Sequence, residues 1–546
     1  MEDKRTIDSF WVMLFLCTFG IIFQYVSFFP CDLGFFGWFC LVPWITTTIV
    51  RNKIAGWQIY FSCLALSLLQ LRWMTVADFR MIGTWVLLAW WCSLFPWFGL
   101  KIIKIFSVDL SIPFAFSVPI VWVFLEYSKS FLLTGFPWYF LAHTQHSVLP
   151  LLQCADFSGT QGVSFIVGMV NGLLTDFILT FLISKPLKFK FRLLIFFSAL
   201  LTFLFLIGLL FYGYWRLNSL QFQKGPVVAL LQGNHAQSVR NSDEHFRQTW
   251  NDYKSMLEIA KNYTVDLIVW PETSFPFELP ANIGSSGPLL GRNDEQDIWS
   301  GPAQLLGVNV AVVEGKEIIC RHNSSMLQNF HTGTVTRYDK IHRVPFGEYI
   351  PFKESIPAMN WLSPYDFDYS IKAGTELTKF DLPCDGKLFS FSALLCYEDS
   401  DFALTRSAMN SLKPPDFFVN QSNDGWFQGT EEQAQHLAVA RFRCVETRRA
   451  MVRAVNTGIS AIIDPAGFIL EPHKIDQVTY RIDEKAVPSF NFFGRQFSNK
   501  ALILIGAVPL CNLSTVYVQF GDWLAWSCFL LIIFGFLIRL FFTKSN

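Results

Sequence analysis

The sequence predicts a membrane protein with about eight transmembrane α-helices and an exported α/β domain inserted before the last helix. Of its 546 residues, 52% are hydrophobic, 17% aromatic and only 16% charged. An ordinary soluble domain is about 25% charged. The missing charge is concentrated at the two ends of the chain, in apolar runs long enough to cross ~30 Å of hydrocarbon. The middle of the chain has a normal share of charged and turn-forming residues.

Eight apolar runs are the candidate spans. The clearest is Leu193–Tyr214, which carries no charge, and the weakest is Ser111–Leu125, which is short and contains two prolines. Gly162–Ser184 contains one acid, Asp176. The other five runs are Phe10–Phe29, Leu33–Val50, Ile54–Leu71, Met81–Leu100 and Trp523–Leu540.

Lysine and arginine gather in alternate loops between these runs, at 4–5, 51–53, 101–104 and 185–192. The positive-inside rule places these loops and the N-terminus in the cytoplasm. Seven crossings then carry the chain outside near Trp215, and the eighth returns the C-terminus to the cytoplasm. The alternative, buried helices of a large soluble protein, does not explain why the basic residues alternate.

Charge and cysteine usage exclude several other classes. Lys+Arg and Asp+Glu both total 43, so no basic surface for nucleic acid is expected. The twelve cysteines contain no C-x-x-C spacing, and no metal site is expected. Four cysteines lie in the exported region, where a disulfide is left open: Cys320, Cys384, Cys396 and Cys444.

Three parts are expected: a bundle of about seven transmembrane helices over 1–220, an α/β domain over 224–490, and a linker, eighth transmembrane helix and cytoplasmic tail over 491–546. Short β-rich runs alternate with longer helical runs in the middle part, which is typical of a layered α/β domain. The expected strands are Val227–Leu231, Asp266–Trp270, Val308–Glu314, Leu388–Leu395, Asp416–Asn420, Ala450–Asn456 and Ser460–Asp464, and the expected helices are Ser242–Tyr263 and Thr430–Thr447.

Three residues of this domain together suggest nucleophilic chemistry. Glu272 follows the apolar strand of DLIVWPET, Cys396 ends that of FSALLCYED, and Lys340 lies in the turn-rich RYDKIHRVPFGEYIP. Alone, each is more often a turn carboxylate, a small buried cysteine or a solvated lysine. Together they form a coherent set, because a carboxylate against apolar walls can deprotonate a thiol and a lysine can stabilise an oxyanion.

These segments resemble the nitrilase, or carbon–nitrogen hydrolase, superfamily through WPET at 270–273, YDK at 338–340 and CYE at 396–398. The resemblance implies an αββα sandwich in which Glu272 is the general base, Lys340 stabilises the oxyanion and Cys396 is the nucleophile. Outside the triad, LLTGFPWY at 132–139, LLQGN at 230–234, NDGWF at 423–427, RAVNTGISAIIDPAG at 453–467 and GDWLAW at 521–526 make the chain similar to the membrane-embedded apolipoprotein N-acyltransferases.

The same resemblance implies a supporting set of residues. Glu348, Tyr397 and Glu398 match positions that support the thiol and shape the site, and Asn323 and Tyr338 are assigned to the same shell. One departure is Asn241, where some family members have tryptophan. It concerns how an outer loop closes rather than the chemistry.

The implied reaction is a ping-pong acyl transfer, the final step of lipoprotein maturation. The sn-1 acyl chain of a phospholipid passes to Cys396 as a thioester and then to the α-amine of the diacylglyceryl-cysteine of an apolipoprotein. The implied partners are the phospholipid donor, the apolipoprotein acceptor and membrane lipid, with no cofactor and no nucleic acid. A monomer in the bacterial inner membrane is expected, with its catalytic domain in the periplasm.

Two other functions remain open from the residues alone. A membrane-tethered amidase would have the same triad, with water as the second acceptor. A receptor or transporter is disfavoured because no internal repeat is visible and Asp176 is the main acid inside a span. The aromatic loop Phe346–Tyr369, with Trp361, Tyr365 and Phe367, is expected either to contact lipid or to be an ordinary packed insertion.

Overall fold

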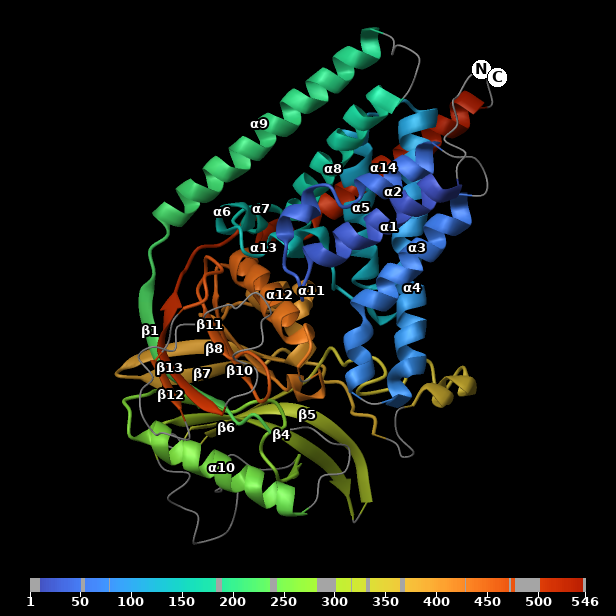
Figure 1. Ribbon diagram of the computed structural model, residues 1–546. Helices are drawn as coiled ribbons and strands as arrows, with labels where there is room; N and C mark the ends of the chain where they lie inside the picture. The colour runs from blue at the N-terminus through green and yellow to red at the C-terminus, as the bar shows by residue number, and fades with distance from the viewer. Residues whose placement is uncertain are drawn as a thin grey trace. The chain divides into compact units, whose positions relative to one another are not determined.

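The chain divides into two compact units in a computed structural model (Figure 1). The structure describes residues 10–50, 55–77, 79–182, 189–235, 243–281, 301–315, 317–329, 334–363, 369–427, 429–470, 473–476 and 501–543. The membrane unit comprises Met1–Thr75, Ile82–Ser219 and Thr515–Asn546, and the α/β unit comprises Val76–Met81 and Leu220–Ser514.

Among the residues that the structure describes, five helices of the membrane unit are long and apolar enough to cross a bilayer. They are α1 (Phe10–Ser27), α4 (Ile82–Lys104), α8 (Thr160–Leu182), α9 (Phe189–Ser219) and α14 (Trp523–Thr543). The other three predicted runs contain the shorter helices α2 (Val42–Val50), α3 (Ala55–Gln70) and α5 (Phe114–Lys129). Five candidate spans are therefore established, and the full count of about eight remains a prediction.

Asp176, the acid inside a predicted span, has a structural partner. Its Oδ1 accepts the backbone N–H of Phe114 at 3.1 Å and its Oδ2 accepts that of Ala115 at 3.0 Å. These are among the N-terminal N–H groups of α5 that have no acceptor within their own helix. Asp176 of α8 therefore caps α5, which explains an acid in this position without a transport pathway.

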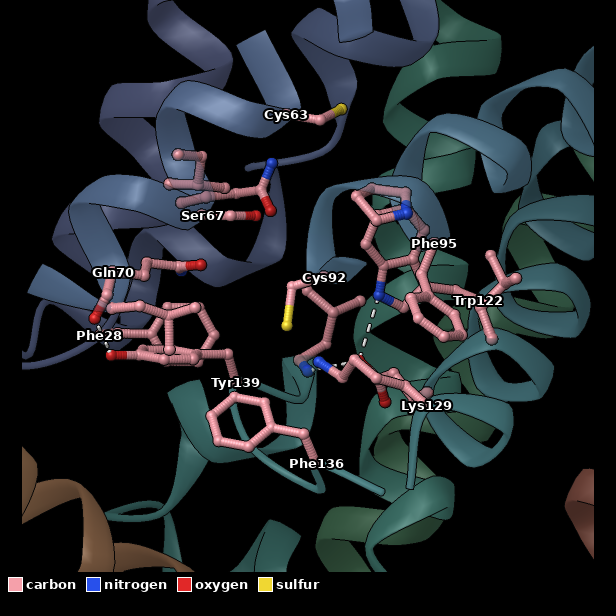
Figure 2. A pocket seen from close by; sticks show the side chains of 17 residues that line it. Phe28, Cys63, Ser67, Gln70, Cys92, Phe95, Trp122, Lys129, Phe136 and Tyr139 are labelled. Carbon is pink, nitrogen blue, oxygen red and sulfur yellow. Dashed lines mark hydrogen bonds between the residues drawn. The ribbon is translucent and has the colours of Figure 1, made fainter. Parts of the chain in front are cut away.

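Two charged residues of α5, Lys129 and Glu126, hold residues 138–141 beside a cavity of ≈ 70 Å³ (Figure 2). Lys129 Nζ donates to the carbonyl oxygen of Trp138 at 2.7 Å. Glu126 Oε1 accepts the backbone N–H of Leu141 at 2.7 Å and the indole N–H of Trp122 at 3.1 Å. Figure 2 shows Lys129 and Trp122 reaching the cavity from one side, with Gln70 and Tyr139 on the other.

The α/β unit contains two sheets. The strands of the first run in the order β12-β13-β1-β2-β4-β5-β6, with β3 beside β4, and those of the second run in the order β11-β10-β9-β8-β7. Their bounds are β1 Gln223–Gln232, β2 Leu267–Val269, β3 Leu279–Pro280, β4 Ala303–Glu314, β5 Glu317–Asn329, β6 Thr334–Asp339, β7 Lys379–Cys384, β8 Lys387–Leu395, β9 Phe417–Ser422, β10 Ala450–Val455, β11 Ala461–Ile463, β12 His473–Asp476 and β13 Leu502–Leu510.

Alternation along β1 explains the layers, because successive side chains of a strand point to opposite faces. Val228 and Leu230 join a core shared with the second sheet, which contributes Leu395 and Val419. Ala229 and Leu231 instead pack against α10 (Asp243–Lys261). With α11 (Phe402–Met409) and α12 (Glu432–Thr447) on the second sheet, this is an αββα sandwich (Figure 1).

All seven strands and both helices expected in the middle part are present, with ends shifted by a few residues. Several further strands were not expected, among them β5, β6 and β7, and one domain boundary differs from expectation. Residues 491–546 were expected to begin with a linker, but Leu502–Leu510 forms β13, which lies between β1 and β12 in the first sheet. The run LILIGAVPL is continuously apolar and close to the last span, so its composition does not distinguish a sheet strand from a membrane approach.

Candidate active site

Glu272, Lys340 and Cys396 meet in the α/β unit. Glu272 follows β2, Lys340 follows β6, and Cys396 follows β8 of the second sheet. Lys340 Nζ lies 3.2 Å from Glu272 Oε1, and the Lys340 side chain has no exposed surface. Charge interactions couple the Cys396 thiol to both residues. The fold therefore brings together three residues that are far apart in the sequence.

Glu272 is held as a buried carboxylate. Its Oε1 accepts hydrogen bonds from Asn323 Nδ2 at 2.7 Å and from Lys340 Nζ. Burial raises the pKa of Glu272 above its ordinary value, and the positive charge of Lys340 only partly opposes this shift. A carboxylate with a raised pKa is suited to accept a proton near neutral pH and return it.

Lys340 is a fixed cation. Its Nζ donates to Glu348 Oε1 at 2.6 Å, and Glu348 Oε2 in turn accepts the backbone N–H of Val344 at 2.7 Å. Burial alone would lower the pKa of Lys340, but the negative charges of Glu272 and Glu348 outweigh it and raise the pKa well above its ordinary value. The lysine therefore stays protonated and can stabilise negative charge on a substrate oxygen.

Cys396 lies at a strained turn. It follows the last residue of β8 and has a left-handed φ of 50°, which is unusual for a residue other than glycine. Asn420 Nδ2 donates to its carbonyl oxygen at 3.0 Å. Burial, followed by the charge of Glu272, raises the pKa of the Cys396 thiol well above its ordinary value. The resting thiol is therefore protonated and needs a base before it can act as a nucleophile.

Glu398 joins the turn at Cys396 to the loop after Lys340. One oxygen accepts the backbone N–H groups of Ile341 at 2.7 Å and His342 at 2.9 Å, and the other accepts that of Leu395 at 2.7 Å. The hydroxyl of Tyr338 donates to the same carboxylate at 2.9 Å. Burial raises the pKa of Glu398 to about 7. Glu398, held by Tyr338, therefore fixes the turn that carries Cys396 relative to the loop that follows Lys340.

Of the other residues singled out in the sequence, Tyr397 and Trp361 lie in the described part of the chain. The Tyr397 ring packs edge-on against His342, with centroids 5.6 Å apart. In the aromatic loop, Trp361 is 90% exposed, which favours the surface-contact interpretation over ordinary packing for this residue. Tyr365, Phe367 and Asn241 lie outside the described residues.

Sequence reasoning missed Gln421 of β9. Its Nε2 donates to the carbonyl oxygen of Trp270 at 2.6 Å, and its Oε1 accepts from Ser325 Oγ at 2.5 Å. Gln421 thus ties the second sheet to the strand end that carries Glu272. A signal was present, since Asn420 and Gln421 directly follow the apolar residues 417–419 of a buried strand and buried polar groups require partners.

A buried group of Asp424, Glu432 and His436 has donor atoms within 4.8 Å of one another, close enough for a metal. Both ring nitrogens of His436 already face carboxylates, Asp399 at 2.7 Å and Asp424 at 3.3 Å. Arg453 also pairs with Asp399. Burial would lower the pKa of His436, but Asp399 raises it to about 10. The donor set fits a charge-balanced structural network better than a metal centre.

Comparison with known proteins identifies both units. Residues 20–173 match the apolipoprotein N-acyltransferase N-terminal domain, and residues 227–480 match the carbon–nitrogen hydrolase family. The apolipoprotein N-acyltransferase of Geobacter metallireducens is 30% identical over 413 residues, which cover 76% of this chain and 71% of that protein. This chain belongs to the apolipoprotein N-acyltransferase family.

Other apolipoprotein N-acyltransferases extend the similarity. That of Pasteurella multocida is 26% identical over 86% of this chain and 87% of its own. That of Coxiella burnetii is 31% identical over 65% of this chain and 67% of its own. An amidase from Nesterenkonia sp. of known structure has a TM-score of 0.34 and 16% identity, over 55% of this chain and 95% of its own. As an apolipoprotein N-acyltransferase, the chain is an enzyme of acyl transfer.

Proposed function

We propose that this apolipoprotein N-acyltransferase moves the sn-1 acyl chain of a phospholipid to the α-amine of the diacylglyceryl-cysteine of an apolipoprotein, through a thioester on Cys396. The observation that carries the mechanism is the buried contact of Lys340 Nζ with Glu272 Oε1 at 3.2 Å, beside a thiol with a raised pKa. This arrangement supplies a base, an oxyanion partner and a nucleophile in one place.

In the first half-reaction, Glu272 takes the proton of the Cys396 thiol. The thiolate attacks the carbonyl carbon of the sn-1 ester, and the oxyanion that forms is stabilised by Lys340. The ester C–O bond then breaks, and Glu272 gives its proton to the leaving lysophospholipid oxygen. The products are the Cys396 thioester and a lysophospholipid.

In the second half-reaction, the α-amine of the apolipoprotein attacks the thioester carbonyl. Glu272 takes a proton from the amine, Lys340 again stabilises the oxyanion, and the C–S bond breaks. Glu272 then returns the proton to the Cys396 sulfur, so that an amide forms and the thiol is restored. Asn323, Glu348, Tyr338, Tyr397 and Glu398 hold these groups in place.

The enzyme works as a monomer in the bacterial inner membrane, with both termini in the cytoplasm and residues 224–490 in the periplasm. Support comes from eight apolar runs and from basic residues in alternate loops. A membrane location suits two lipid substrates, and the exposed Trp361 is suited to contact the bilayer surface.

Mass spectrometry tests the mechanism. After exposure to phospholipid, the purified enzyme should carry one acyl chain on Cys396, and addition of a diacylated lipopeptide should remove the adduct and give a triacylated product. Cys396→Ala should form neither. Release of free fatty acid without the triacylated product would instead support a membrane-tethered amidase or hydrolase.

A further inference from the structure

An apolar cavity of ≈ 410 Å³ lies within the membrane unit, between α8, α9 and the start of α14. Its lining is almost entirely apolar and largely aromatic, with Phe165 of α8, Phe205 and Leu209 of α9, and Trp523 of α14. The rings of Phe165 and Phe205 lie edge-on to each other, with centroids 6.5 Å apart. The three helices are candidate membrane spans, so the cavity is built from membrane helices. We refer to it as the α8–α9 slot.

A polar cluster lies at one end of the slot. Tyr212, which lines the slot, donates its hydroxyl to Asp156 at 2.7 Å and accepts from Arg216 Nη2 at 2.8 Å. Arg216 Nε lies 3.1 Å from Asp156, and the arginine side chain is 23% exposed whereas Asp156 is 4% exposed. Within the described part of the chain, the Nη1 group of Arg216 has no hydrogen-bond acceptor.

The residues around this cluster resemble those found at a membrane–water interface. Tyr214 is 60% exposed and Trp215 is 52% exposed, both at the end of α9 beside Arg216. Tryptophan and tyrosine concentrate at the level of lipid headgroups because they combine an apolar body with a polar tip. If α9 crosses the bilayer, these residues put Arg216 at headgroup depth and the slot at acyl-chain depth.

We propose that the α8–α9 slot binds a glycerophospholipid of the surrounding bilayer, with an acyl chain inside the slot and the phosphate on Nη1 of Arg216. The volume lies within the range of small-ligand sites, and apolar cavities stay dry and take apolar guests. Guanidinium groups pair well with phosphate. Asp156 and Tyr212 orient the arginine while leaving one of its nitrogens for the ligand.

This site shares no residue with the catalytic set, which lies in the α/β unit. Its occupant is a bound lipid rather than the reacting one. The test therefore uses an ether-linked phospholipid, which has no ester for Cys396 to attack, so that its result is independent of the proposed reaction.

Native mass spectrometry of the full chain in detergent, titrated with the ether-linked phospholipid, measures binding. Leu209→Trp should fill the slot and reduce bound phospholipid at least about tenfold. The matched control is Phe211→Trp, at a 75% exposed position of the same helix, which should bind as the original chain does. Equal binding by the two variants, whether high or low, would overturn the proposal.

A second comparison tests the phosphate contact. The original chain should bind the ether-linked phospholipid about tenfold more tightly than an ether-linked diacylglycerol analogue, because only the former has a phosphate for Arg216. Arg216→Gln should abolish this preference, and Arg216→Lys should retain part of it. A preference unchanged in Arg216→Gln would contradict the proposed orientation.

Discussion

Two carboxylates share one lysine at the centre of the site, and this arrangement governs its pH dependence. Glu272, the proposed general base, must be ionised to accept a proton, and burial raises its pKa above the ordinary value for glutamate. Activity should therefore be lost as the pH falls through this raised pKa, while the Lys340 cation persists because its own pKa is raised. A pH profile of acyl-enzyme formation measures this acid limb, and an acid limb at the ordinary glutamate pKa would contradict the assignment.

The variant Glu348→Gln separates the two carboxylates. The negative charge of Glu348 raises the pKa of Glu272, and its removal leaves Lys340 to act on Glu272 alone. The acid limb should move to lower pH, and the maximal rate should fall because Glu272 becomes a weaker base and Lys340 loses its 2.6 Å partner. Glu354→Gln, at an exposed position nearby, is the control and should leave the profile in place.

At the scale of elements, the site depends on how two segments are joined. Glu398 accepts backbone N–H groups from the end of β8 and from the loop after β6. Glu398→Gln keeps the size of the side chain but replaces an acceptor oxygen by a donor that faces N–H groups. The variant should lose about 2 kcal/mol or more of stability and acylate slowly. Thermal unfolding of this variant is compared with that of Glu376→Gln, a control at an exposed position. An unchanged midpoint would show that the hydrogen bonds of Glu398 do not stabilise the fold.

The contact between α8 and α5 gives an analogous prediction in the membrane unit. Asp176→Leu would leave the N–H groups of Phe114 and Ala115 without their acceptor, at a cost of about 1–3 kcal/mol. Asp176→Asn retains one acceptor oxygen and should be affected less. In detergent, the thermal unfolding midpoint should be highest for the original chain, lower for Asp176→Asn and lowest for Asp176→Leu. Equal stability of both variants would exclude a capping role.

The elements that the sequence predicts best are those whose pattern is local. β2 and β8 are recognisable as apolar runs that end in polar residues, and the resemblance of their ends to known motifs locates Glu272 and Cys396. The polar strand β5 and the apolar strand β13 are recognisable only from their partners, because their composition resembles a loop in one case and a membrane segment in the other. The role of Gln421 depends on a contact between two sheets, which no local pattern contains.

At the scale of the whole molecule, the overall composition averages two units that differ in polarity, one suited to lipid and one suited to water. The 16% of charged residues is an average over apolar membrane helices and an α/β unit of ordinary composition. The α/β unit pairs charges that it buries, such as Lys340 with Glu272 and Arg453 with Asp399. The membrane unit uses its few charges to cap helices and hold loops, as Asp176 and Lys129 do.

The number of spans decides on which side of the membrane the α/β unit lies. If only the five long helices cross, four crossings precede residue 220, so the α/β unit shares the side of the N-terminus and the C-terminus lies opposite. With about eight crossings, seven precede it, so the α/β unit lies opposite the N-terminus and both termini share one side.

Basic residues in alternate loops favour the second arrangement. Alkaline phosphatase, active only outside the cytoplasm, should therefore be active when fused after residue 218 and inactive after residues 52 and 104 or at the C-terminus. Green fluorescent protein at the same positions should give the opposite pattern. Phosphatase activity at the C-terminus together with its absence after residue 218 would establish the five-span arrangement, and would leave the proposed catalytic site on the cytoplasmic side.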